Sequence, residues 1–111
     1  MGTTGTLMGV SRYLKECNKD IRSVGVEPVM GHTLQGLKNM KESYKPGIFD
    51  KSLPTQIVNV SDDDAYETAR QLARKEGIFV GISAGATLAG AIEVCKAAPE
   101  GSTVLAMLPD T

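Results

Sequence analysis

The chain has 111 residues, a formal net charge of −1 and 41% hydrophobic residues, values typical of one small globular domain. The near-neutral charge gives no electrostatic reason to expect nucleic acid or a membrane surface as a partner. The sequence shows no apolar run near the roughly 20 residues of a membrane span and no signal-peptide pattern, so we expect a cytoplasmic protein. Cys17 and Cys95 lack C-x-x-C spacing, and we expect reduced, half-buried thiols there.

The first half of the chain alternates helix and strand patterns. Apolar residues at helical spacing predict an amphipathic helix at residues 6–17. They are Leu7, Val10, Leu14 and Cys17. A β-prone run at 21–27 predicts a short strand that Pro28 closes, because proline has no N–H to give to a strand ladder. The next expected elements are a short helix at 33–43, a loop at 44–55 and a strand at 56–60.

The second half begins with a helix whose two ends carry local signals. Ser61 can cap its first turn, where the aspartates at 62–64 suit the helix dipole, and Gly77 ends it. Its expected buried stripe is Ala65, Ala69, Leu72 and Ala73. The remaining expected elements are a strand at 78–80, a loop at 81–85 with Ser83 as a helix cap, a helix at 86–97 and a strand at 103–108.

This alternation predicts an α/β fold in which helices flank a parallel sheet. Two glycine-rich loops, at residues 2–6 and 81–86, are then expected to face one crevice outside the carboxyl ends of the strands. The first precedes a helix and is suited to bind a phosphate through backbone N–H groups and threonine hydroxyls. The alternatives without a ligand are a flexible terminus for the first loop, and close helix–sheet packing for the small residues that begin the helix after the second: Gly85, Ala86, Ala89, Gly90 and Ala91. A loop of the first kind normally follows a strand, so we interpret the chain as part of a larger enzyme.

Several motifs in register resemble the cysteine synthase and cystathionine β-synthase family, which are fold-type II pyridoxal 5′-phosphate (PLP) enzymes with a tryptophan synthase β-like fold. The matching segments are residues 2–12, 24–28, 46–49 and 76–86. The resemblance covers essentially the whole chain and is strongest to B-type cysteine synthases. It implies that residues 1–111 form an incomplete, PLP-binding α/β domain of a two-domain enzyme.

The resemblance also implies roles for particular residues. Ser83 would face the pyridine nitrogen of PLP, and Gly36 would lie in a segment near the substrate. Pro109 and Asp110 would lie close to the far edge of the ring. The PLP phosphate would be bound by Gly2, Thr3, Thr4, Gly5 and Thr6. We expect no metal site, because the aspartates at 62–64 read as a helix cap and His32, the only histidine, as an exposed loop residue.

The reaction implied is synthesis of L-cysteine from O-acetylserine and sulfide, by β-elimination to α-aminoacrylate and β-replacement, in a homodimeric parent enzyme. The family's Schiff-base lysine lies in an N-terminal half that has no counterpart here, and the eight lysines of this chain lie on polar faces or in loops. We therefore assign no catalytic residue and expect the chain alone to be inactive without the missing half. Lys38, Asn39 and Pro109 depart from the B-type pattern that the resemblance implies, and the departure favours sulfide over thiosulfate. The alternatives are cystathionine β-synthase, another β-replacing enzyme, or a non-catalytic phosphate-binding remnant.

Overall fold

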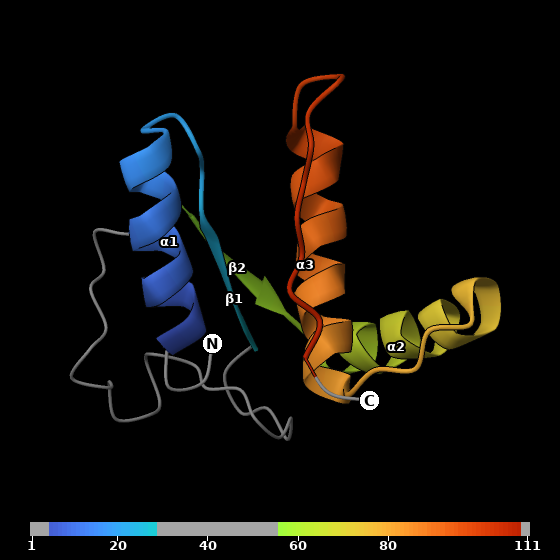
Figure 1. The fold of residues 1–111 in the computed structure, drawn as a ribbon. Helices are drawn as coiled ribbons and strands as arrows, with labels where there is room; N and C mark the ends of the chain where they lie inside the picture. Colours follow the sequence, from blue (N-terminus) through green and yellow to red (C-terminus); the bar gives the residue numbers. More distant parts are fainter. Residues whose placement is uncertain (1–4, 29–55, 110–111) are drawn as a thin grey trace.

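The computed structural model describes residues 5–28 and 56–109. Its elements in chain order are α1 (Gly5–Cys17), β1 (Val24–Pro28), β2 (Gln56–Val60), α2 (Asp62–Glu76) and α3 (Ile82–Ala97) (Figure 1). The helix expected at 33–43 and the loop expected at 44–55 lie outside the described residues.

The two strands form a small parallel sheet, as the alternating pattern predicted. Their register runs from Val24 opposite Gln56 to Pro28 opposite Val60. The strand expected at 56–60 is confirmed, whereas β1 begins three residues later than expected and includes Pro28 as its last residue. Proline fits there because a strand that stops needs no further N–H for the ladder. Helices flank this sheet, with α1 on one side and α3 together with α2 on the other (Figure 1).

Local signals determine both ends of α2. The Ser61 hydroxyl accepts a hydrogen bond of 3.2 Å from the backbone N–H of Asp64, and aspartates fill the first turn. Gly77 takes the left-handed conformation at φ 67°, and its N–H donates to the carbonyl of Ala73. The cap, the acidic first turn and the glycine stop were all expected from the sequence and are confirmed.

Close approach of α3 to its neighbours builds the core. A Cβ atom at Gly85 would collide with the Ala65 carbonyl oxygen of α2, and one at Gly90 would lie 2.6 Å from Cγ2 of Val26 in β1. Gly90 thus shows the close helix–sheet packing that was one interpretation of these small residues, whereas Gly85 packs against a helix instead. The fully enclosed centre consists of Val60, Ala65 and Ala86, with partly buried Val26, Val58, Ile82 and Ala89 packed around it.

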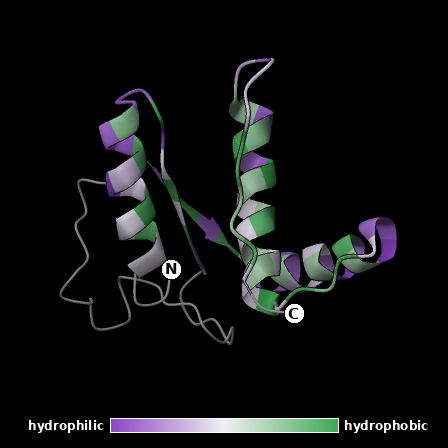
Figure 2. Cartoon of the chain, viewed as in Figure 1, coloured by the Kyte–Doolittle hydropathy of each residue, from purple (hydrophilic) through white to green (hydrophobic). Residues whose placement is uncertain are grey.

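The expected strands at 78–80 and 103–108 are wrong, because the described residues of both segments are extended without belonging to a sheet. A strand is defined by its ladder, and no backbone hydrogen bond joins either segment to β1 or β2. Phe79 and Leu105 are consequently 72% and 81% exposed. Figure 2 shows these extended segments as hydrophobic stretches, whereas the far end of α2 is hydrophilic.

Two further expectations about burial need correction. Cys17 and Cys95 are free and exposed rather than half-buried. In α1 the buried residues are Met8 and Ser11, while Val10, expected on the inner face, is 41% exposed. The spacing of apolar residues predicts that a helix forms. It predicts less well which residues of a broad apolar stripe are buried against the rest of the molecule. No helix within residues 5–28 and 56–109 is long and apolar enough to cross a membrane.

Candidate functional site

The carboxyl ends of the two strands and the starts of two helices lie at the same end of the molecule. Because β1 and β2 are parallel, both strands finish at one edge of the sheet. Figure 1 shows α1 and α3 beginning at this end. Loops and helix starts at the carboxyl edge of an open parallel sheet are the usual place for a ligand.

Charge distinguishes the three helix starts near this edge. The first turns of α1 and α3 hold no acidic residue, whereas that of α2 holds Asp62, Asp63 and Asp64. The first backbone N–H groups of a helix have no partner within the helix and lie at the positive end of its dipole. The aspartates compensate that charge in α2. The starts of α1 and α3 therefore suit an anion, and the start of α2 does not.

The structure describes four of the predicted site residues, and of these Thr6 lines the cavity given below, whereas Gly5, Ser83 and Pro109 do not. Gly5 and Thr6 form the exposed start of α1, and Ser83 lies half-buried in the first turn of α3. Thr6 lines a cavity of about 620 Å³ together with Thr87, one turn beyond Ser83, and with Met107 of the final extended segment. Pro109 is exposed at the end of that segment. The remaining predicted residues lie outside the described ranges: Gly2, Thr3, Thr4, Gly36 and Asp110.

Ser83 does not cap α3, contrary to expectation. The helix begins at Ile82, and the capping position belongs to Gly81, at φ −68° and ψ 165°, which offers no side chain. Ser83 thus falls inside the first turn, where its carbonyl accepts a 3.1 Å hydrogen bond from the Thr87 hydroxyl. Within the described part of the chain its own hydroxyl has no hydrogen-bond partner. That hydroxyl is available to a ligand, in company with uncapped backbone N–H groups.

Sequence reasoning missed two residues near this edge. Glu27, the fourth residue of β1, is only 5% exposed and stands opposite Asn59 in the register. Its signal was a single carboxylate inside the otherwise apolar run of 24–28, because a glutamate is rarely buried in a protein unless it is paired. Thr87 carried no signal of its own, because a threonine that bonds a carbonyl four residues earlier looks like any other helical threonine.

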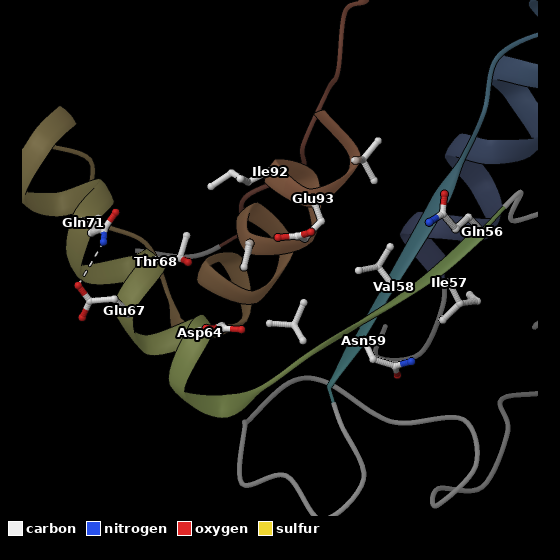
Figure 3. Close-up of a pocket in the computed structure, with 13 residues that line it drawn as sticks. Gln56, Ile57, Val58, Asn59, Asp64, Glu67, Thr68, Gln71, Ile92 and Glu93 are labelled. Carbon is white, nitrogen blue, oxygen red and sulfur yellow. Dashed lines mark hydrogen bonds between the residues drawn. The ribbon is translucent and has the colours of Figure 1, made fainter. Parts of the chain in front are cut away.

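A second hollow, about 640 Å³ in volume, lies between β2, α2 and α3 (Figure 3). Its sides carry the carboxylates of Asp64, Glu67 and Glu93. A hydrogen bond from the Gln71 amide, 3.3 Å long and drawn in Figure 3, lowers the pKa of Glu67, and Arg70 adds to the effect. Carboxylates in this hollow would repel a phosphate. The edge where α1 and α3 begin therefore suits an anion better than this hollow does.

Comparison with known proteins now decides the family. The family described as "Pyridoxal-phosphate dependent enzyme" matches residues 1–110. The chain belongs to this family. It is 44% identical over 110 residues to cysteine synthase B of Salmonella typhimurium, covering 99% of this chain and 36% of that relative. The chain thus spans about a third of the length of the curated relatives it matches.

Solved structures agree with this assignment. The crystal structure of O-ureido-L-serine synthase superimposes with a TM-score of 0.91 at 42% identity, covering 100% of this chain and 37% of that chain. The O-acetylserine dependent cystathionine beta-synthase of Helicobacter pylori gives a TM-score of 0.89 at 34% identity, covering 99% of this chain and 38% of that one. The predicted fold class, part of a fold-type II PLP enzyme, is confirmed, and so are the family and its cofactor, pyridoxal 5′-phosphate.

The described residues fit this cofactor. PLP carries a phosphate group and a ring nitrogen, so a protein that binds it needs an anion site and a hydrogen-bonding group for the nitrogen. The acid-free start of α1 is suited to the first, and the Ser83 hydroxyl has the chemistry that the second requires. No group of three acidic, cysteine or histidine side chains in the described part could hold a metal ion.

Proposed function

We propose that residues 1–111 form the phosphate-binding part of a PLP-dependent cysteine synthase, which makes L-cysteine from O-acetylserine and sulfide in the cytoplasm. The observation that carries this proposal is the 44% identity to cysteine synthase B along 99% of the chain. The parallel strand edge with the anion-suited starts of α1 and α3 supports it, because a phosphate-bearing cofactor needs both.

In this proposal the chain positions the cofactor. Backbone N–H groups and hydroxyls of Gly2, Thr3, Thr4, Gly5 and Thr6 bind the phosphate. Ser83 bonds the pyridine nitrogen, and as a neutral hydroxyl it does not hold that nitrogen protonated as a carboxylate would. Pro109 and Asp110 border the ring, and Gly36 lies beside the substrate. When bound, PLP withdraws electrons from the substrate's α-carbon.

The Schiff-base lysine of this proposal lies in polypeptide beyond residues 1–111. The lysines near the ends of α2 and α3 do not serve, since Lys75 and Lys96 lie in last turns, away from the site edge, and Lys96 lies 3.5 Å from Glu93. The chain alone is therefore expected to be inactive, and activity requires the lysine-bearing half. We further propose that the complete enzyme is a homodimer.

A second β-replacing reaction is favoured by two of the similar proteins. O-ureido-L-serine synthase of Streptomyces lavendulae is 42% identical over 120 residues, and the Helicobacter pylori structure is an O-acetylserine dependent cystathionine beta-synthase. Both names indicate addition of a different nucleophile to a serine-derived substrate. An experiment on the complete enzyme, in which residues 1–111 are joined to the lysine-bearing half, would separate the alternatives. It would measure which product forms when sulfide and homocysteine compete as nucleophiles. Cysteine formation supports the first proposal, and preference for homocysteine would replace it. Tight binding of the cofactor without turnover of either would indicate a non-catalytic remnant.

The phosphate site itself is testable on the chain alone with pyridoxine 5′-phosphate, which lacks the aldehyde that reacts with surface lysines. We expect it to bind, and pyridoxine without phosphate to bind much more weakly. Gly5→Asp should weaken binding by about tenfold or more, because it places a carboxylate beside the phosphate. An acid at this position favours the helix itself, so unfolding would not explain the loss.

Gly9→Asp is the matched control. Gly9 lies one turn further along α1, is exposed, and has no atom within 4 Å of an added Cβ. Binding measured by equilibrium dialysis should stay near that of the parent. Equal losses from both variants would mean that general charge governs the binding, and residues 2–6 would lose their proposed role.

A further inference from the structure

The first turn of α3 is bonded by a side chain through a carbonyl group and not through its N–H groups. The backbone ladder of this helix begins with a 3.1 Å hydrogen bond from the Gly85 N–H to the Gly81 carbonyl. The Thr87 hydroxyl donates a further bond, also 3.1 Å long, to the carbonyl of Ser83. Within the described part of the chain, no other side chain forms a hydrogen bond with this turn. The N–H groups at the start of the helix are therefore left to a ligand.

The start of α2 is arranged differently. There the Ser61 hydroxyl accepts a hydrogen bond from the Asp64 N–H, which occupies a donor that an anion could otherwise bind. A threonine that donates to the carbonyl four residues earlier uses none of these donors. Such a bond adds little to the stability of a helix and often bends it. Its main effect at Thr87 is thus on the geometry of the peptide group that it contacts.

This bond joins Ser83 to the part of α3 that packing holds in place. Gly85 lies in close contact with α2, and Gly90 lies in close contact with β1. Thr87 falls between these two glycines in the sequence, whereas Ser83 precedes both. Thr87 and Ser83 are both half-buried and lie on one face of the helix, because residues four apart are neighbours there. The Thr87 hydroxyl therefore ties the first turn to the packed section of the helix.

We propose that Thr87 is a positioning residue for Ser83. By bonding the Ser83 carbonyl, Thr87 fixes the backbone from which the Ser83 side chain projects, and so determines where the Ser83 hydroxyl meets the ring nitrogen of the cofactor. Thr87 acts through Ser83 and not on the ring. This inference rests on the proposed function, because it requires that Ser83 bonds that nitrogen.

The test measures binding of pyridoxine 5′-phosphate to the full 111-residue chain by equilibrium dialysis. Ser83→Ala should weaken binding by about two- to tenfold, the effect of losing one neutral hydrogen bond. Thr87→Val keeps the shape of the side chain but removes its hydroxyl, and it should weaken binding by about threefold, within the same range. Thr87→Ser keeps the hydroxyl and should bind the ligand as the parent does.

The double variant separates a positioning role from a structural one. Residues that act as a unit have non-additive effects, so Thr87→Val should weaken binding by less than about twofold once Ser83 is replaced by alanine. A general loss of helix stability would instead weaken binding equally with and without Ser83. Thr68→Val is the matched control, because it removes a hydroxyl from another half-buried helical threonine, in α2. Binding by this variant should be unchanged.

Several results would overturn the inference. An equal loss from Thr87→Val in both backgrounds, no loss from it, or weak binding by Thr87→Ser would each show that Thr87 does not act through Ser83. These results would leave the proposed function intact, since Gly5→Asp tests the phosphate site separately. If Ser83→Ala bound the ligand as the parent does, the contact with the ring nitrogen would be wrong and this inference would fail with it. A parent chain that did not bind the ligand would remove the proposed site and the inference together.

Discussion

Gly85→Ala is expected to destabilise the chain although alanine is the better helix former. A methyl group at Gly85 would collide with the Ala65 carbonyl oxygen and lie 2.9 Å from the Cβ of Ala69 and 3.2 Å from its nitrogen. Two of these three neighbours are backbone atoms, so α2 and α3 must separate rather than let a side chain rotate. Overpacking costs about 1–3 kcal/mol, and the gain in helix propensity returns about 1 kcal/mol.

The expected net loss is therefore up to about 2 kcal/mol in the free energy of unfolding, which lowers the melting temperature by about 4–8 °C for each kcal/mol lost. Thermal unfolding followed by far-ultraviolet circular dichroism measures it. Gly9→Ala is the control, because it makes the same change in an exposed helix position where nothing lies within 4 Å, and it should stabilise by about 0.5–1 kcal/mol. If both variants raised the melting temperature alike, the close α2–α3 contact would not exist in solution.

Three other predictions concern single side chains. Ser61→Ala should cost about 0.5–2 kcal/mol by removing the cap on the Asp64 N–H, with Ser61→Thr much milder in urea unfolding. The pKa of Glu67 is lowered by its hydrogen bond from Gln71, so this exposed group favours the folded state above its unfolded pKa and loses that contribution as the pH falls through the folded pKa. An NMR titration should show a lowered pKa for Glu67 in the parent chain and a pKa closer to the ordinary value in Gln71→Leu. If the pKa of Glu67 were the same in both, the hydrogen bond from Gln71 would not be the cause. In the complete enzyme, Ser83→Ala should reduce turnover about tenfold, and a full loss or no loss would contradict a neutral hydrogen bond to the ring nitrogen.

Local chemistry made α2 predictable from sequence. Ser61, the aspartates that follow it and Gly77 each act on backbone groups within a few residues, and the structure confirms all of them. The strand at 56–60 was also predictable, because its β-prone run ends at a helix cap that fixes where it must stop. The extended segments at 78–80 and 103–108 were not, since a strand needs a neighbour that its own residues do not specify.

In the candidate site too, some features could be predicted from nearby residues and others could not. The glycine-rich start of α1 and the serine near the start of α3 carried recognisable motifs, but nothing in the short run around Glu27 indicates that this residue is only 5% exposed. The start of α3 was misplaced because serine is a common helix cap and glycine a less common one. In the structure that preference is reversed at residues 81 and 83.

This reversal has a physical consequence for α3. A serine or aspartate at position 81 would satisfy the first backbone N–H groups of the helix with its own oxygen, and those are the groups that an anion or a polar ligand would bind. Gly81 leaves them open and places Ser83 beside them, within the first turn. The same helix is held against α2 through Gly85 and against β1 through Gly90. The run of small residues that begins α3 therefore lacks a stabilising side-chain cap. Its close packing against α2 and β1 holds the helix in place, so the open backbone N–H groups at the helix start have a fixed position.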